Sequence, residues 1–251
     1  MTQALFDKYY YSRSDFIGGT RAFAHVCRAN ILPGSEILEI GAGPTNQCSK
    51  MLSEMGNVTG LDIDPDVKSN SWLSKAVVYD GIEIPFANSS FDACVSNFVL
   101  EHVSNPLEHF AEISRVLRPG GVYCFRTPNL FHYVSMGARL MPHFMHLVLA
   151  NRLRGLSKDA HEPYRTYYRC NTRKSLRNLC SASGLDVPSI IMVEPEPSYG
   201  RAHPLLFYPM MAYERLVNFS EITSGFRITL LAAVRKPAGE NPNWEVYRIG
   251  R

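Results

Sequence analysis

The 251-residue sequence lacks several features that would place it in other classes of protein. It has no run of five or more lysines and arginines and a net charge of only +3, which argues against nucleic-acid binding. No stretch of 18 apolar residues occurs, so we expect no membrane-spanning helix. The first residues, MTQALFDKYYYSR, contain no apolar signal core, and we therefore expect a cytoplasmic protein.

The six cysteines are dispersed and form no Cys-x-x-Cys pair, which argues against both a disulfide framework and a zinc site. Cys94 and Cys124 fall in apolar, strand-like runs, where a reduced thiol behaves as a small hydrophobe. His143 and His146 have the i, i+3 spacing of a metal pair, but no third ligand lies nearby. We expect a reducing environment and no bound metal.

Strand-like and helix-like segments alternate along the chain, and the 45% hydrophobic content suits a single domain over residues 1–251. Such alternation predicts a parallel sheet with right-handed crossovers, with ligands beyond the carboxyl ends of its strands. Strands are expected at 37–40, 57–63, 75–80, 91–99, 122–126, 187–193 and 228–234. Helices are expected at 20–30, 46–55, 106–117, 171–183 and 205–219, with a further one starting at the Asp64-Pro65-Asp66 turn.

The rest of the chain is organised around residues 36–46, which read EILEIGAGPTN. A strand that ends in Gly41 and Gly43 and leads into a helix brings backbone N–H groups close to a ligand, because no side chain blocks the approach. Asp62 ends the next strand, 19 positions after Gly43, where an acid can accept hydrogen bonds from ribose hydroxyls. The same edge of the sheet should also carry Asp80, Asn97 and Thr127.

Two nucleotide cofactors fit a strand-end acid: a dinucleotide and S-adenosylmethionine. The dinucleotide fingerprint requires a third glycine, and Asn46 stands at that position. No lysine or arginine lies between Glu39 and Gln47 to bind a pyrophosphate. Glu39 would repel phosphates but would suit an ammonium or sulfonium group, so the charge pattern favours S-adenosylmethionine.

These residues resemble the class I S-adenosylmethionine-dependent methyltransferases, particularly the broad group with the ubiquinone- and menaquinone-pathway enzymes. The resemblance covers residues 37–129, and Thr45 departs from it where the family often has glycine. It implies an α/β fold: a Rossmann-like, doubly wound sheet of seven strands, mostly parallel, with the last strand antiparallel. The motifs are LEIGAGPT (38–45), GLDIDP (60–65), IPFANSSFDACVSNFVLEHV (84–103) and RVLRPGG (115–121).

The resemblance also implies a role for each cofactor-binding residue. Glu39 and the backbone of Gly41, Ala42 and Gly43 would hold the methionine moiety. Asp62 would bind the ribose. The remaining residues expected around the adenine and the sulfonium are Ile63, Asp80, Gly81, Asn97, Phe98 and His102, the last of which could instead pack beneath the pocket.

Three segments lie outside this pattern. Residues 1–30 are expected to form an N-terminal cap and residues 236–251 a polar tail. Residues 130–169 are too long for a plain connection and rich in methionine, so we expect an inserted helical lid over the substrate. A fixed helical buttress and a membrane-surface helix are the alternatives for this lid.

We expect methylation of a small-molecule acceptor, with oxygen as the acceptor atom and His132 or His161 as the base. Tyr164, Arg165, Tyr168 and Arg169 would bind the acceptor. Carbon or nitrogen methylation of a lipid-, quinone- or glycan-like acceptor is the alternative reaction, and a non-catalytic binding protein is the alternative class. The sequence does not determine the oligomeric state.

Overall fold

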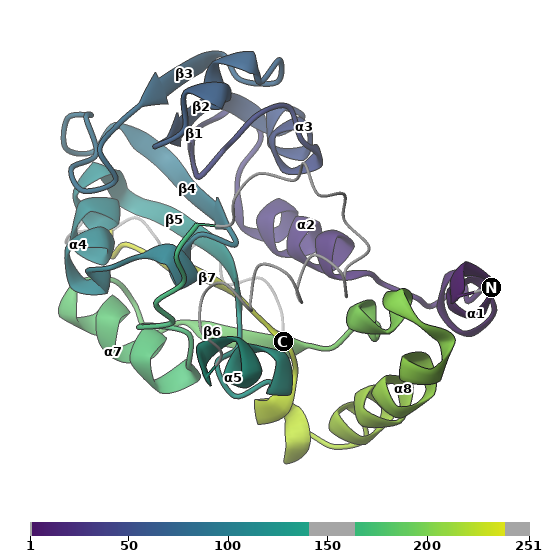
Figure 1. The fold of residues 1–251 in the computed structure, drawn as a ribbon. Coiled ribbons are helices and arrows are strands. Elements are labelled where there is room, and N and C mark those ends of the chain that lie inside the picture. The colour runs from purple at the N-terminus through teal and green to yellow at the C-terminus, as the bar shows by residue number, and fades with distance from the viewer. Residues whose placement is uncertain (1, 141–163, 239–251) are drawn as a thin grey trace.

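The computed structural model describes residues 2–140 and 164–238, which fold around one seven-stranded sheet (Figure 1). The strand order is β3-β2-β1-β4-β5-β7-β6, and β7 runs antiparallel to both its neighbours while the other pairs are parallel. This confirms the predicted topology. The strands are β1 (Ser35–Ile40), β2 (Gly56–Asp62), β3 (Lys75–Val78), β4 (Phe91–Asn97), β5 (Leu117–Pro128), β6 (Ser189–Val193) and β7 (Thr229–Arg235).

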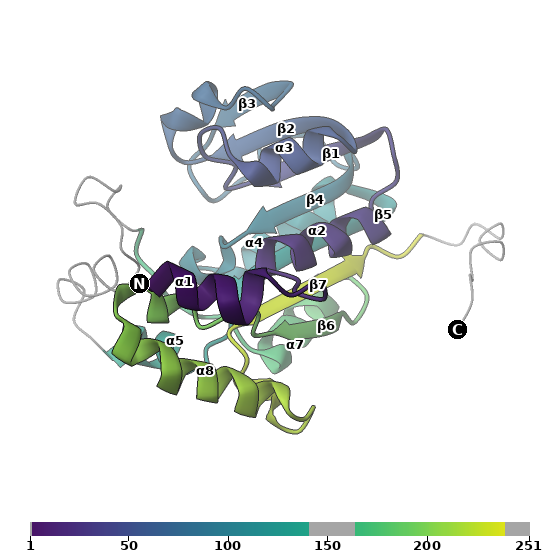
Figure 2. The ribbon, with the colours of Figure 1, turned by 90° about the vertical axis from the view of Figure 1, so that its right-hand side faces the viewer.

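Helices cover both faces of the sheet, with α2 and α3 on one face and α4 and α7 on the other (Figures 1 and 2). The α-helices are α1 (Thr2–Phe6), α2 (Gly19–Asn30), α3 (Gln47–Ser53), α4 (Pro106–Val116), α5 (Tyr133–Leu140), α7 (Arg173–Ala182) and α8 (Pro204–Asn218). Shorter turns are the π-helical η1 (Asp7–Tyr11) and the 3-10 turns η2 (Pro65–Ser69), η3 (Leu100–His102), η4 (Ser198–Ala202) and η5 (Thr223–Phe226).

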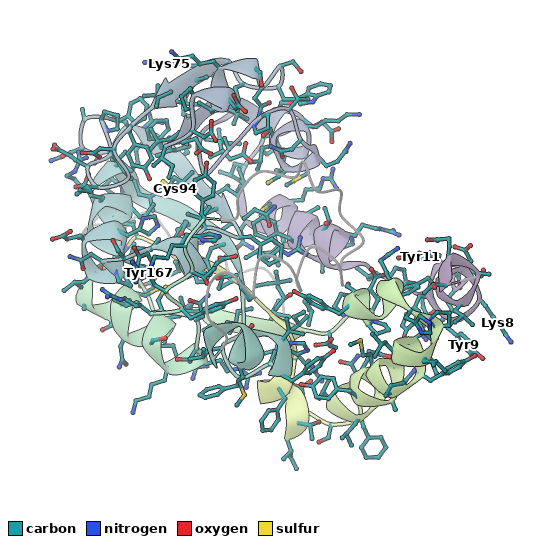
Figure 3. All side chains as sticks on the ribbon, in the orientation of Figure 1. Lys8, Tyr9, Tyr11, Lys75, Cys94 and Tyr167 are labelled. Carbon is teal, nitrogen blue, oxygen red and sulfur yellow. The ribbon has the colours of Figure 1, made fainter. Side chains whose placement is uncertain are left out.

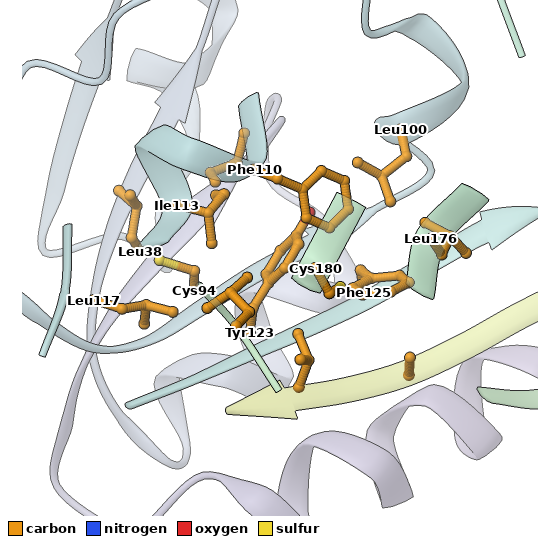
Figure 4. Close-up of a cluster of buried hydrophobic side chains, with 14 of the residues drawn as sticks. Leu38, Cys94, Leu100, Phe110, Ile113, Leu117, Tyr123, Phe125, Leu176 and Cys180 are labelled. Atoms are coloured by element: carbon orange, nitrogen blue, oxygen red, sulfur yellow. The ribbon is translucent and has the colours of Figure 1, made fainter. Parts of the chain in front are cut away.

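The larger core lies between the sheet and α4 with α7 (Figure 4). The Phe110 ring of α4 meets the Tyr123 ring of β5 edge-on, with the centroids 5.8 Å apart. Leu176 and Cys180 of α7 are fully buried in the same cluster. Aromatic pairs of this kind add to the stability that apolar burial provides, so the central strands are held firmly from this side.

Two local predictions differ from the structure. β5 begins at Leu117, before the predicted 122, because the Arg-Pro-Gly-Gly stretch is accommodated by a register shift opposite Phe91 to Ala93 of β4. The helix expected after Asp64 is only the 3-10 turn η2, although Asp64 does cap it by accepting the Asp66 N–H at 2.9 Å.

The N-terminal segment packs on α8. Phe6 meets Phe207 of α8 at a centroid distance of 5.1 Å, and the Tyr10 hydroxyl donates to Glu214 Oε2 at 2.9 Å. Tyr9 and Tyr11 lie at the opposite side of the molecule from Tyr167 (Figure 3). The expected cap of residues 1–30 is therefore split between this cluster and α2 on the sheet.

The structure describes the expected lid only at its two ends. Residues 133–140 form α5, and residues 164–169 return toward the sheet. Residues 141–163 lie outside the described part of the chain, and so do residues 239–251 of the expected polar tail. Within 2–140 and 164–238, no helix is long and apolar enough to cross a bilayer.

Candidate functional site: a cavity at the carboxyl ends of the central strands

The turn after β1 requires glycine at its first position. Gly41 has a φ of +68°, in the left-handed region, and a Cβ there would lie 2.4 Å from Val99 Cγ2. Asn46, which stands where a dinucleotide site would have its third glycine, braces this turn instead. Its Nδ2 donates to the carbonyl of Ala42 at 2.6 Å, and its Oδ1 accepts the N–H groups of Cys48 and Ser49 to cap α3.

Asp62 closes the turn from the end of β2. Its Oδ2 accepts the N–H of Gly43 at 2.8 Å, and its Oδ1 accepts the N–H of Asp64 at 2.9 Å. Each carboxylate oxygen can accept a further bond, so two acceptor sites remain for a ligand. Asp62 is 8% exposed and lines the cavity described next.

A cavity of about 460 Å³ opens beside this turn. The carboxyl ends of β1, β2 and β4 form one wall, and the segment that begins at Tyr164 forms another. Its lining residues are Ile40, Gly41, Asp62, Ile63, Tyr79, Gly81, Ile82, Phe98, Val99, His102, Val103, Ser104, Asn105, Glu108, His109, Tyr164, Arg165 and Tyr167.

Hydrogen bonds fix residues 164–167 at the rim of the cavity. The Tyr164 hydroxyl donates to Asp64 Oδ2 at 2.8 Å, and the Tyr167 N–H donates to the carbonyl of Glu101 at 2.7 Å. His102 Nδ1 lies 3.0 Å from the carbonyl oxygen of Arg165. The HEPYRTYYR stretch therefore reaches the cavity through its described part.

Glu39 is buried behind the turn on β1. It is 3% exposed, and its Oε2 has no hydrogen-bond partner among the described residues. Burial raises the pKa of this carboxyl to about 7, and hydrogen bonds from Ser49 and Cys48 offset only part of that effect. A second unpartnered acceptor, Asn97 Oδ1, is buried at the end of the neighbouring β4. Such atoms suit a ligand that brings hydrogen-bond donors.

The structure brings eight of the predicted site residues to the cavity wall: Gly41, Asp62, Ile63, Gly81, Phe98, His102, Tyr164 and Arg165. Glu39, Ala42, Gly43, Asp80 and Asn97 lie within two positions of a lining residue without lining the cavity themselves. Asp80 is exposed, and its Oδ1 accepts the N–H of Ile82 at 2.9 Å. Tyr168 and Arg169 lie off the wall, where Arg169 Nη1 donates to the carbonyl of Ser104.

The structure does not bring His132 to the cavity, contrary to its expected role as a base. Its ring is buried, lies edge-on to Tyr213, and has Nε2 3.5 Å from Glu194 Oε2. A side chain held there cannot reach an acceptor in the cavity. His161, His143 and His146 lie outside the described residues. Among the described residues, no three histidines, cysteines or acids are grouped to hold a metal.

Sequence reasoning missed the wall formed between β4 and the first turn of α4, to which Val103, Asn105 and His109 belong. His109 is 8% exposed, and burial lowers its pKa to about 4, so it is neutral at physiological pH. Their position in the sequence could have indicated this wall. These residues follow the carboxyl end of β4, which lies at the same edge of the sheet as the other predicted site residues.

The comparisons with known proteins agree with this geometry. Residues 38–125 match the family model described as a methyltransferase domain. The chain is 36% identical over 100 residues to a malonyl-[acyl-carrier protein] O-methyltransferase of Serratia marcescens, an alignment that covers 38% of this chain and 39% of that protein. It is 31% identical over 137 residues to a demethylmenaquinone methyltransferase of Tropheryma whipplei, covering 48% and 56% of the two chains.

The whole-chain fold is also similar to solved structures. An S-adenosylmethionine-dependent methyltransferase from Mesorhizobium loti aligns with a TM-score of 0.56 at 17% identity, covering 87% of this chain and 98% of that one. At this identity the likeness shows the fold alone. The matched sequence spans about half or less of these curated relatives. The family model covers residues 38–125, which carry the turn and the ends of β1, β2 and β4.

Proposed function

We propose that this chain is a class I S-adenosylmethionine-dependent methyltransferase, which transfers the methyl group of that cofactor to a small-molecule acceptor. The observation that carries the proposal is the acidic turn: Glu39 with an unpartnered buried oxygen, Gly41 in a left-handed conformation, and Asp62 at the mouth of the cavity. A pyrophosphate would be repelled by these two carboxylates, whereas a ligand carrying an ammonium and ribose hydroxyls would be bound by them.

The residues fit the cofactor part by part. Glu39 would accept from the ammonium of its methionine moiety, and Asp62 would use its free lone pairs for the ribose. Ile63 and Gly81 would enclose the adenine, with Asp80 next to them, and Asn97, Phe98 and His102 would lie toward the sulfonium. When bound, the cofactor supplies a methyl group already activated on a cationic sulfur. The protein then has to orient the acceptor and exclude water.

Oxygen remains our proposed acceptor atom, and one relative is named an O-methyltransferase. The base would come from His161, or the acceptor would need none, because His132 is buried elsewhere. The other named relative, a demethylmenaquinone methyltransferase, supports the alternative of carbon methylation of a quinone-like acceptor. A non-catalytic binding protein is disfavoured because the acids and glycines of the turn are all in place.

Label transfer tests this proposal directly. We expect S-adenosylmethionine with a deuterated methyl group to pass its label to members of a panel of small hydroxy acids, phenols and quinols, with mass spectrometry as the readout. Because no metal is proposed at the site, turnover should survive an excess of chelator. Turnover that is lost on chelation and restored only by a divalent ion would contradict the metal-free proposal. Label found only on carbon or nitrogen would select the alternative reaction.

The raised pKa of Glu39 predicts how cofactor binding depends on pH. Since the ionised carboxylate is the form that binds the ammonium, affinity for S-adenosylhomocysteine should rise about tenfold from pH 6 to pH 8 and then level off. 5′-Methylthioadenosine lacks the ammonium and should show no such rise. A Glu39→Gln variant should flatten the profile. Equal pH profiles for the two ligands in the wild-type protein would argue against the role given to Glu39.

The raised pKa of Glu39 also makes the free energy of unfolding depend on pH, in the opposite direction to cofactor affinity. Between the ordinary pKa of 4.5 and the folded value of about 7, the folded state binds more protons than the unfolded state. The contribution of Glu39 to the free energy of unfolding is therefore fully present below pH 4.5 and is lost as the pH rises through 7. Glu39 thus costs stability at the pH where it would bind the cofactor, as expected of a binding residue.

A further inference from the structure

Arg126 is a half-buried cation that the proposed function does not use. It lies two residues before the end of β5, in register with Asn97 of β4. Alternate side chains of a strand point to the same face of the sheet, so Arg126 shares a face with Val122 and Cys124. These two residues pack into the core on the α2 and α3 side. The Arg126 side chain therefore emerges on that face, at the same edge of the sheet as the cavity.

The Arg126 guanidinium forms no ion pair in the described part of the chain, although the charge of Glu101 acts on it at longer range. Its Nη1 donates to Thr20 Oγ1 at 3.3 Å, its Nε has no hydrogen-bond partner among the described residues, and no carboxylate there lies within salt-bridge distance. Burial lowers its pKa to about 10, so it stays charged at neutral pH. A half-buried guanidinium with an unbonded Nε and no ion pair can still take a partner from a ligand.

Arg126 adjoins the cavity through Phe98, although Arg126 is not itself among the lining residues. The guanidinium lies over the Phe98 ring, 4.3 Å from its centroid, and Phe98 lines the cavity. On the other side Gly19 begins α2, and a Cβ there would lie 2.8 Å from Arg126 Nη2. The N-cap Gly18 makes no side-chain cap, and the first turn of α2 carries no acid. The N-terminus of α2 thus adds no negative charge beside the guanidinium.

The strand order shows where Arg126 lies relative to the proposed cofactor residues. The cofactor residues lie on β1 and β2, β4 stands in the middle with Phe98 after its end, and Arg126 lies on β5 beyond it. We propose that Arg126 binds a carboxylate of the methyl acceptor, which makes the acceptor an organic acid. This inference rests on the proposed function and adds the chemical class of the substrate. A planar guanidinium binds a carboxylate through two parallel hydrogen bonds, which would fix the acceptor's orientation.

The test follows the Arg126 Nε resonance by NMR in the complex with S-adenosylhomocysteine. Acetate is the probe and acetamide, of the same shape without charge, is its control, both at constant ionic strength. We expect a saturable shift with acetate, none with acetamide, and at least tenfold weaker acetate binding in Arg126→Met. Arg28→Met, which removes an exposed arginine paired with Glu54, is the matched control and should bind acetate normally. No saturable shift with acetate in the wild-type complex would overturn the proposal, and this arm needs no variant to fold.

A second experiment tests whether Arg126 binds the acceptor or the cofactor, because the methionine moiety of the cofactor also carries a carboxylate. If Arg126 serves the acceptor, Arg126→Met should bind S-adenosylhomocysteine and 5′-methylthioadenosine as the wild type does. A loss of tenfold or more for S-adenosylhomocysteine alone would assign Arg126 to the cofactor and overturn the proposal. Failure of the wild type to bind S-adenosylhomocysteine would instead count against the proposed function, which keeps the two failures distinct.

Discussion

Replacing Asp62 with alanine is expected to weaken binding of S-adenosylhomocysteine by about ten- to a hundredfold. The carboxylate accepts the N–H groups of Gly43 and Asp64 and keeps two lone pairs that could accept from ribose hydroxyls. Loss of a hydrogen bond to a charged group costs roughly 1.5–3 kcal/mol, which corresponds to that range of affinity. Calorimetry on the purified variant measures the effect.

Two further variants show where the effect of Asp62→Ala arises. Asp62→Asn keeps the size and one acceptor oxygen, so its loss of affinity should be smaller. Asp15→Ala removes an exposed acid that pairs with Arg13, and it should bind as the wild type does. If Asp62→Ala is folded by circular dichroism and binds S-adenosylhomocysteine with unchanged affinity, the carboxylate does not hold the ribose.

Replacing Gly41 with alanine is expected to reduce cofactor affinity by at least tenfold and to destabilise the fold. The added Cβ would lie 2.4 Å from Val99 Cγ2, and Gly41 has a φ of +68°. A left-handed conformation costs a non-glycine residue roughly 1–2 kcal/mol, and relief of the clash must move the turn, whose backbone faces the ligand. Thermal unfolding and calorimetry together measure the two effects.

Gly184 provides a matched control for the backbone conformation alone. Its φ is +70°, nothing lies within 4 Å of a Cβ built there, and it is remote from the cavity. Gly184→Ala should therefore lose stability without losing affinity. The double variant Gly41→Ala with Val99→Ala removes the clashing methyl group and should recover part of the binding. If Gly41→Ala bound the cofactor as well as Gly184→Ala does, close packing at the turn would not govern recognition.

The parts of the site that could be predicted are those fixed by local chain geometry. Gly41, at the end of an apolar strand, and Asp62, at the end of the next strand, had to meet because parallel strands place their carboxyl ends at one edge. The structure puts both on the cavity wall. The order of strands and helices followed from hydrophobic periodicity in the same way, since each period selects one kind of element.

The parts that could not be predicted depend on contacts between distant segments. His132 follows a strand end, as a base should, but its ring turns toward Glu194, a residue 62 positions away that no local pattern identifies. The wall that includes His109 depends on how α4 approaches the sheet. The contacts of Arg126 with Phe98 and Gly19 likewise join segments that are far apart in the sequence.

The central claim is that the acidic glycine turn selects S-adenosylmethionine over a dinucleotide. The most direct test is calorimetric titration of the wild-type protein at pH 8 with S-adenosylhomocysteine and, separately, with NAD⁺. The account predicts that S-adenosylhomocysteine binds at least a hundredfold more tightly, since Glu39 and Asp62 attract its ammonium and ribose and repel a pyrophosphate. NAD⁺ binding as tight as that of S-adenosylhomocysteine, or no binding of S-adenosylhomocysteine at all, would contradict it.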